Sequence, residues 1–132
     1  LNVMAQRFAK LDGNNIINIE SLDDLYCTND EGVINETTAA NHFTKTGVDP
    51  NIYKMETAAR VNSPAIGGTY DSVNDKFIKL KPYSTWVLNE STWQWNPPSG
   101  FPADSIENGG SKNYIWNDST SSFDEVVNTP EV

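Results

Sequence analysis

One eight-residue pattern occurs three times in the second half of this chain and constrains its fold more than any other feature. Each copy opens with a large apolar residue followed by Asp or Asn, continues with polar residues, and closes on Phe or Trp. The copies are Tyr70–Phe77, Leu88–Trp95 and Trp116–Phe123. This order predicts a β-hairpin with a short loop, because Asp and Asn side chains bond back to the backbone of a turn. The first and eighth residues of each copy are expected to face each other across the two strands.

The aromatic side chains in and around the copies permit two interpretations. In one, they form the core of the hairpins, which need large side chains to bury enough apolar area. In the other, they are exposed platforms on which sugars stack. Buried indoles favour the first interpretation, and strand alternation places both indoles of Trp93-Gln94-Trp95 on one face, as a sheet with one covered face requires. The aromatic residues concerned are Tyr70, Phe77, Trp86, Trp93, Trp95, Tyr114, Trp116 and Phe123.

The N-terminal part predicts a further hairpin and a short helix. Alternating residues at 7–11 meet the turn sequence Asp-Gly-Asn-Asn at 12–15, and Asp-Gly is the strongest kind of hairpin signal. The helix is expected over 36–46, because Asn35 is a good N-cap and Gly47 follows the last residue. Its buried stripe is expected to hold Ala39, Ala40 and Phe43.

These patterns together predict a mainly β (α+β) fold. Residues 52–61 fit either a strand or a helix, and the alternation within the run together with the flanking prolines favours the strand. The chain then divides into residues 1–66, with the N-terminal hairpin, one short helix and a strand, and residues 67–132, with the series of three aromatic hairpins. We expect the first part to attach the protein to its partner.

Composition narrows the classes of function. The 132 residues carry a formal charge of −9, which disfavours binding to a phosphate backbone. Cys27 is the only cysteine and His42 the only histidine, so Cys-based zinc sites and an internal disulfide framework are excluded. No apolar run approaches the ~20 residues of a membrane span.

Candidate chemistry is sparse. The sequence has no nucleophile elbow, and its carboxylates are scattered, so no general acid/base pair stands out. Cys27 is expected to be a buried small hydrophobe rather than a reactive thiol. Asp71, Asn74 and Asp75 have the oxygens for calcium but not the spacing of an EF-hand, and their position favours turn residues. We therefore expect no enzymatic activity, no cofactor and no metal.

Several motifs resemble a small module encoded by marine tailed bacteriophages, especially cyanophages. They cover the repeat region and the opening of the chain, whereas residues 21–45 match only loosely. The third copy departs from the family by closing on Phe123 where Trp is usual. The motifs are Gly67-Gly68-Thr69-Tyr70-Asp71, Lys81-Pro82-Tyr83, Trp86-Val87-Leu88-Asn89, Trp95-Asn96-Pro97-Pro98 and Tyr114-Ile115-Trp116-Asn117, with Phe8-Ala9-Lys10-Leu11-Asp12 near the N-terminus.

The resemblance implies a non-enzymatic structural or accessory protein of the virion. Such a protein is expected to bind a major capsid or tail protein in many copies, and to contact neither nucleic acid nor membrane. The alternative is a carbohydrate-binding module that contacts the host surface through exposed Trp and Tyr.

The partner contact is expected in residues 1–19, because this segment has no row of lysines that would protect a strand edge. By contrast, the three lysines Lys76, Lys79 and Lys81 are expected to share one face along the second strand of the first hairpin, either solvated or against an acidic partner. The expected contact residues are Phe8, Leu11, Ile16, Ile17 and Ile19.

Overall fold

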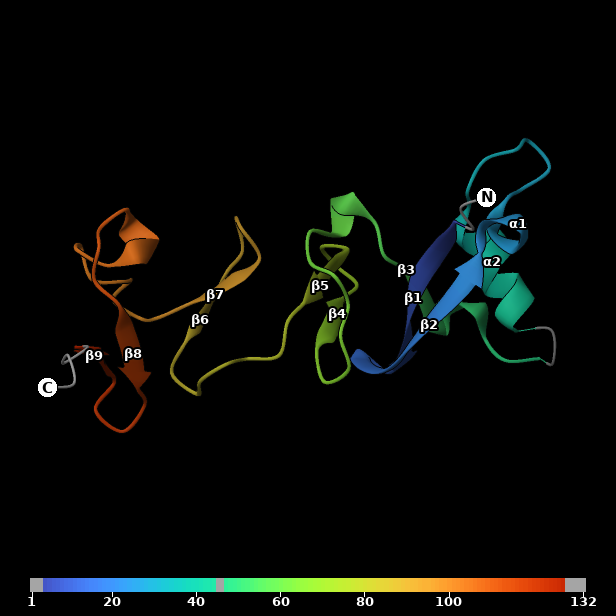
Figure 1. The fold of residues 1–132 in the computed structure, drawn as a ribbon. Helices are drawn as coiled ribbons and strands as arrows, with labels where there is room; N and C mark the ends of the chain where they lie inside the picture. Colours follow the sequence, from blue (N-terminus) through green and yellow to red (C-terminus); the bar gives the residue numbers. More distant parts are fainter. Residues whose placement is uncertain (1–3, 45–46, 128–132) are drawn as a thin grey trace, which may run out of the picture. The chain divides into compact units, whose positions relative to one another are not determined.

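The computed structural model describes residues 4–44 and 47–127, which form two compact units (Figure 1). Unit 1 is Leu1–Leu80 and unit 2 is Lys81–Val132. The described residues are mainly β, as predicted, with antiparallel strands and short helices. Unit 1 contains β1 (Ala5–Asp12), β2 (Asn15–Asp23), α1 (Asp24–Cys27), α2 (Glu36–Phe43), η1 (Pro50–Ile52), β3 (Tyr53–Met55), η2 (Ala58–Arg60), β4 (Thr69–Asp71) and β5 (Lys76–Ile78). Unit 2 contains β6 (Val87–Asn89), β7 (Gln94–Asn96), η3 (Ile106–Asn108), β8 (Tyr114–Asn117) and β9 (Ser122–Glu125).

Unit 1 is built on a five-stranded sheet in the order β3-β1-β2-β4-β5. The predicted N-terminal hairpin is its longest pair, and Gly13 takes a φ of 59° in the two-residue loop between β1 and β2. The register shifts between Lys10 and Leu11, so that Ile17 is an extra residue opposite β1. The bulge separates two neighbouring isoleucines: Ile16 is 2% exposed and Ile17 is 48% exposed.

Both faces of β1 are covered by other parts of unit 1. Successive side chains of a strand point to opposite faces. Phe8 points to one face and packs in a cluster with residues of α1, α2 and β3. Ala9 and Leu11 point to the other face and pack with Tyr70 and Phe77 of the first repeat. Figure 1 shows this arrangement, with α1 and α2 on one side of the β1–β2 hairpin and β4 and β5 on the other.

The prediction of partner contact by residues 1–19 is wrong for its main residues. Phe8, Leu11 and Ile16 are buried in the core of unit 1, where they contact this chain itself. Ile19 is partly buried against the second cluster, and Ile17 is the exposed member of the set. The prediction assumed open edges, but β1 and β2 are interior strands of the five-stranded sheet.

The predicted helix is α2, and its start is as expected. The Oδ1 atom of Asn35 accepts a hydrogen bond from the backbone N of Thr38 at 3.0 Å, and Ala39 and Ala40 are buried. The helix ends at Phe43, before the expected end, and residues 45–46 of the prediction lie outside the described residues. The four-residue helix α1 was not predicted.

Residues 52–61 form less strand than predicted. Only Tyr53–Met55 pairs with β1, opposite Phe8 to Lys10, and the segment then turns into η2. Arg60, the last residue of η2, is buried, with 8% of its surface exposed.

All three repeat copies are hairpins with one loop design, as predicted. The paired first and eighth residues are Tyr70 and Phe77, Leu88 and Trp95, and Trp116 and Phe123. In each copy the second residue caps the loop: Oδ1 of Asp71, Asn89 or Asn117 accepts two backbone N–H groups at 2.8–3.3 Å. The sixth residue has a positive φ in every copy. These residues are Asp75 (57°), Trp93 (60°) and Ser121 (51°).

This loop corrects the interpretation of Trp93 and Trp95 as neighbours on one face. Trp93 is the last loop residue in a left-handed conformation, and the strand β7 begins after it at Gln94. Strand alternation therefore does not relate the two indoles.

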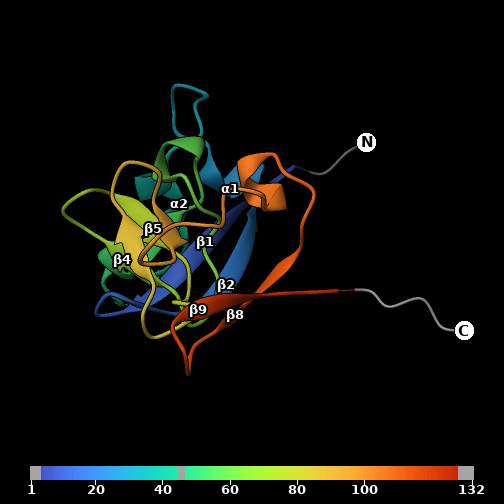
Figure 2. The same cartoon turned by 90° about the vertical axis from the view of Figure 1, so that its left-hand side faces the viewer.

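The first hairpin belongs to unit 1, whereas the sequence predicted it in one part with the other two hairpins. Asn15 of β2 pairs with Thr69 of β4, so β4 and β5 extend the sheet of unit 1. The division between the units therefore falls after Leu80 rather than after residue 66. Unit 2 keeps two of the three hairpins, and each forms its own two-stranded sheet; Figure 2 shows β8 and β9 as one ribbon closed by its loop.

The three lysines do not form a stripe along one strand. Strand β5 ends at Ile78, so only Lys76 lies in it, and Lys79 and Lys81 follow its end. The Nζ atom of Lys76 donates to the backbone O of Ala59 at 2.8 Å. Among the described residues, no helix is long and apolar enough to cross a membrane.

Candidate functional site

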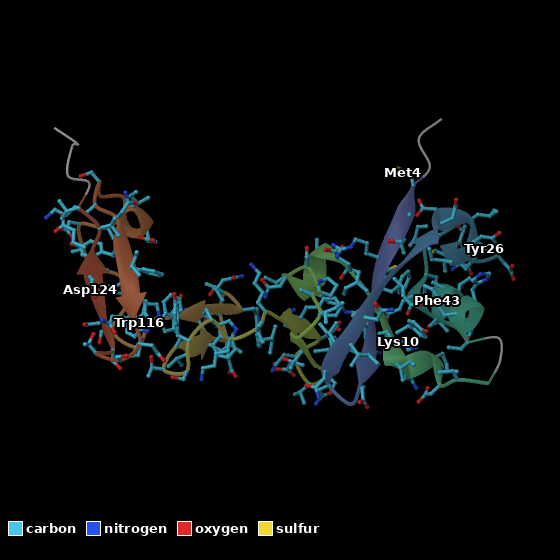
Figure 3. All side chains as sticks on the ribbon, turned by 60° about the horizontal axis from the view of Figure 1, so that its bottom comes forward. Met4, Lys10, Tyr26, Phe43, Trp116 and Asp124 are labelled. Atoms are coloured by element: carbon cyan, nitrogen blue, oxygen red, sulfur yellow. The ribbon has the colours of Figure 1, made fainter. Side chains whose placement is uncertain are left out.

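An exposed apolar surface lies at the end of unit 1 that carries α1. Met4, directly before β1, is 64% exposed, and Leu25 and Tyr26 of α1 are 74% and 47% exposed; we call these three residues the α1 surface. The backbone O of Met4 accepts a hydrogen bond from the N of Asp24 at 3.0 Å, which joins β1 to the start of the helix. Figure 3 shows Met4 at the end of β1 and Tyr26 on the outside of α1.

Local contacts explain why these side chains point outward. The Oδ1 atom of Asp23 caps the helix by accepting from the N of Leu25 at 2.9 Å. Cys27, on the opposite side of this single turn, is 0% exposed and donates its thiol to the backbone O of Asp23 at 3.4 Å. Cys27 thus takes the inner side of the turn, whereas Leu25 is largely exposed and Tyr26 about half exposed. The ring of Tyr26 stacks on His42 of α2, with centroids 4.4 Å apart.

Cys27 is a buried packing residue, as predicted. Burial, followed by the charges of Asp24 and Asp23, raises the pKa of its thiol. A raised pKa leaves less thiolate, which is the nucleophilic form.

A polar cluster in unit 1 centres on Arg60, which no sequence motif marks. Its guanidinium forms ion pairs with Glu36 at the start of α2 and with Asp75 in the loop of the first hairpin, the latter at 2.7 Å. It also donates to the backbone O of Met55 at 2.7 Å, and lies 5.5 Å from the ring centroid of Tyr70. Arg60 thus joins α2, β3 and the β4–β5 hairpin.

The ionisation of this cluster follows from its contacts. Burial lowers the pKa of Arg60, but hydrogen bonds to Glu36 and Asp75 outweigh it, so the net shift is upward. Burial and the hydrogen bond that its hydroxyl donates to Asp75 raise the pKa of Tyr70 to about 12. The hydrogen bond from Tyr70 and the pair with Arg60 hold the pKa of Asp75 below its usual value. Every member is held by a partner within the fold, which is the arrangement of a structural cluster.

Three of the predicted aromatic residues of unit 2, Tyr114, Trp116 and Phe123, cluster with Trp86. The ring centroid of Trp86 lies 5.8 Å from that of Trp116 and 6.5 Å from that of Phe123. It also lies 5.8 Å from the ring centroid of Phe101, which is outside the predicted set of aromatic residues. Tyr114 reaches the cluster through Phe123, at 6.3 Å. Tyr70 and Phe77 form a separate pair in unit 1, with centroids 5.5 Å apart.

The four indoles do not form an exposed row. Trp93 and Trp116 are each 8% exposed, and Trp86 and Trp95 are half-buried. The Nζ atom of Lys81 lies 5.5 Å from the ring centroid of Trp95. These exposures favour packing over the sugar-platform interpretation.

Asp118 ties the third hairpin to the segment before β6. Its carboxylate accepts from the hydroxyls of Ser84 and Thr85, at 2.9 and 3.1 Å, and from Nε1 of Trp116 at 3.1 Å. The bond from Trp116 and the two hydroxyls lower the pKa of Asp118. The carboxylate of Asp118 therefore has a structural role, because its three donors come from the third hairpin and from the segment before β6.

The carboxylates considered for calcium are used by the hairpin loop. Asp71 accepts from the backbone N of Val73 and of Asn74 at 3.0 Å, and from the side chain of Asn74 at 2.9 Å, while Asp75 is bound to Arg60. Within residues 4–44 and 47–127, no group of three or more His, Cys, Asp or Glu side chains is placed to hold a metal ion.

Comparisons of the chain with protein-family models, with curated proteins and with solved structures returned no match.

Proposed function

We propose that this chain is a non-enzymatic accessory protein of a tailed-phage virion that acts as a protein-binding module. Unit 1 attaches the protein to a major capsid or tail protein, in many copies per particle. The virion assignment rests on the sequence resemblance. The attachment role rests on the α1 surface, where Met4, Leu25 and Tyr26 are held in exposed positions.

The α1 surface has the properties of a binding surface. Exposed apolar groups that cluster at one place commonly mark interaction sites, because water makes their burial favourable. The surface is also fixed in shape by the Asp23 cap and by the buried Cys27, so binding would cost little further ordering.

Two observations support assembly over the alternative functions. The half-buried and buried indoles favour it over a carbohydrate-binding module that uses exposed aromatic rings. The polar cluster at Arg60 is paired within the fold, and this favours a structural protein over an enzyme.

The test is incorporation into purified phage particles. Leu25→Glu places a charge on the α1 surface, and Val73→Glu is the matched control, because Val73 is 91% exposed in the β4–β5 loop of the same unit. Wild type and Val73→Glu are expected in the particles at equal copy number. Leu25→Glu is expected at a level lower by about tenfold or more, since burying an unpaired charge opposes binding.

Two results contradict the proposal at different points. Absence of the wild-type chain from purified particles, measured by mass spectrometry, rejects the virion assignment. Normal incorporation of Leu25→Glu, with circular dichroism like that of wild type, rejects the α1 surface as the attachment site.

A further inference from the structure

Unit 2 carries an open groove of about 470 Å³, beside the second hairpin. Residues of β6, the end of β7, the proline-rich joint that follows it and Asn108 of η3 line the groove. Figure 1 shows β6 and β7, which form its hairpin side. The volume falls within the range of small-molecule sites in proteins, about 300–1,000 Å³.

The polar lining consists of three amide side chains with unused hydrogen-bonding groups. Oδ1 of Asn89 accepts from the backbone N of Ser91 and of Thr92, which leaves its NH₂ group. The NH₂ group of Asn108 donates to the backbone O of Phe101 and of Pro102, at 2.9 and 3.0 Å, which leaves its oxygen. At the groove, Asn89 can therefore act as a donor through its NH₂ group, and Asn108 as an acceptor through its oxygen.

Asn96 adds the third amide. Among the described residues, none hydrogen-bonds to its side chain, so both its oxygen and its NH₂ group are available at the groove. A ligand rich in hydroxyls fits such a lining, because each hydroxyl both donates and accepts. The remaining lining is apolar, with Val87, Leu88 and Phe101 among it, and can cover the carbon-bound hydrogens of a sugar ring.

The charge of the groove and of unit 2 favours neutral ligands over anionic ones. No side chain that lines the groove is charged. Unit 2 as a whole has two lysines against seven acidic residues, a formal charge of −5, which repels phosphate, sulfate and carboxylate groups. A neutral ligand therefore matches both the lining and its surroundings.

We propose that this groove binds a segment of a neutral saccharide. The site differs from a platform of exposed indoles, since its contacts are the amides of Asn89, Asn96 and Asn108 and the neighbouring apolar side chains. It is also independent of the α1 surface, which belongs to unit 1.

The experiment titrates the isotope-labelled full chain with oligosaccharides while nuclear magnetic resonance follows its side-chain amides. The probes are neutral oligosaccharides of glucose, galactose, mannose or N-acetylglucosamine. A sulfated oligosaccharide and a neutral peptide of similar size are the comparators. At least one neutral saccharide is expected to shift the amide signals of Asn89, Asn96 and Asn108.

Asn96→Ala removes one groove amide without breaking a hydrogen bond within the described fold. It is expected to weaken saccharide binding about tenfold. Asn113→Ala is the matched control, because Asn113 is an exposed residue of unit 2 outside the groove, and binding is expected to stay unchanged.

Three outcomes overturn the proposal. One is that no neutral saccharide shifts the groove signals at about 10 mM, well above the Kd of a functional site. Another is that the groove signals shift only with the sulfated oligosaccharide or the peptide. The third is that Asn113→Ala weakens binding as much as Asn96→Ala.

Discussion

The two units share one hairpin loop, but the contacts that stabilise the hairpins differ between unit 1 and unit 2. In unit 1 the first hairpin extends a five-stranded sheet, packs Tyr70 and Phe77 on Leu11, and is bound to α2 through Arg60. In unit 2 each hairpin is a separate two-stranded sheet. Ring contacts around Trp86 and the hydrogen bonds of Asp118 join them instead.

From this difference we infer that the loop sets the shape of a hairpin, whereas the contacts made by its strands set its stability. A two-stranded hairpin alone is marginally stable in water. Unit 1 adds ladder hydrogen bonds and the ion pairs of the buried Arg60, whereas unit 2 depends on the contacts of a few large rings. The two units should therefore respond to different substitutions.

The largest effect is expected from Arg60→Ala. The change removes the buried guanidinium that hydrogen-bonds to Glu36, Asp75 and the backbone O of Met55 and that packs against Tyr70. It should lower the free energy of unfolding of unit 1 by about 3 kcal/mol, because hydrogen bonds to charged groups each contribute roughly 1.5–3 kcal/mol. The control is Arg7→Ala, which breaks an exposed ion pair with Glu56 and should cost less than about 1 kcal/mol. Urea unfolding, followed by signals of each unit, measures both; similar losses in the two variants would remove the special role of Arg60.

The next effect belongs to unit 2. Trp86→Ala removes the ring that contacts Tyr83, Phe101 and Trp116. It should cost about 2–3 kcal/mol, which is below the roughly 3–5 kcal/mol for a fully buried large aromatic, because the ring is half-buried. Unit 1 should stay folded, since Trp86 lies outside it. Amide hydrogen exchange resolves the two units. Protection that stays intact at β8 and β9 would show that the rings do not hold unit 2 together.

Acid should weaken unit 2 through Asp118. Hydrogen bonds from Trp116 and Ser84 lower the pKa of this carboxyl below its ordinary value of 3.8, so the folded state releases its proton more readily than the unfolded state. The resulting stability is fully present above pH 3.8 and is lost as pH falls from there through the lower pKa of the folded state. Asp118→Asn should remove this part of the acid dependence. An unchanged profile of tryptophan fluorescence against pH would assign the acid sensitivity to other groups.

The sequence predicted the hairpin loops well because their cause is local. Asp71, Asn89 and Asn117 each bond to backbone N–H groups two and three residues later, so the eight-residue pattern contains the whole interaction. The N-cap of α2 at Asn35 was predictable for the same reason.

The sequence did not predict contacts between distant segments. Arg60 meets residues 24 positions before it and 15 positions after it, and no periodic pattern marks such a cluster. The pairing of β4 with β2 rests on Asn15 and Thr69. Phe8 and Leu11, expected at a partner contact, belong to the core because α1 and α2 pack on one face of β1 and the first hairpin packs on the other. The asparagines of the proposed saccharide groove are visible in the sequence, but nothing in the sequence indicates that they line one groove.

The smallest predicted effect tests the shared loop itself. Ser121 adopts a φ of 51°, which is unfavourable for a residue with a Cβ, and its side chain is exposed. Ser121→Gly should stabilise unit 2 by about 0.5 kcal/mol, because relief of the left-handed strain slightly exceeds the entropy that glycine loses on folding. Ser119→Gly, two positions earlier and without a positive φ, should instead destabilise by a similar amount.

Glycine at the same loop position in unit 1 should lower stability, whereas at Ser121 it should raise it. Asp75→Gly relieves a φ of 57° but removes the ion pair with Arg60 and the hydrogen bond from Tyr70, so it should destabilise unit 1. Denaturation midpoints of the three glycine variants make the comparison directly. If Ser121→Gly and Asp75→Gly shift stability in the same direction, the loop conformation outweighs the context of each hairpin. Opposite shifts would show that the ion cluster, and not the hairpin design, distinguishes the first hairpin from the third.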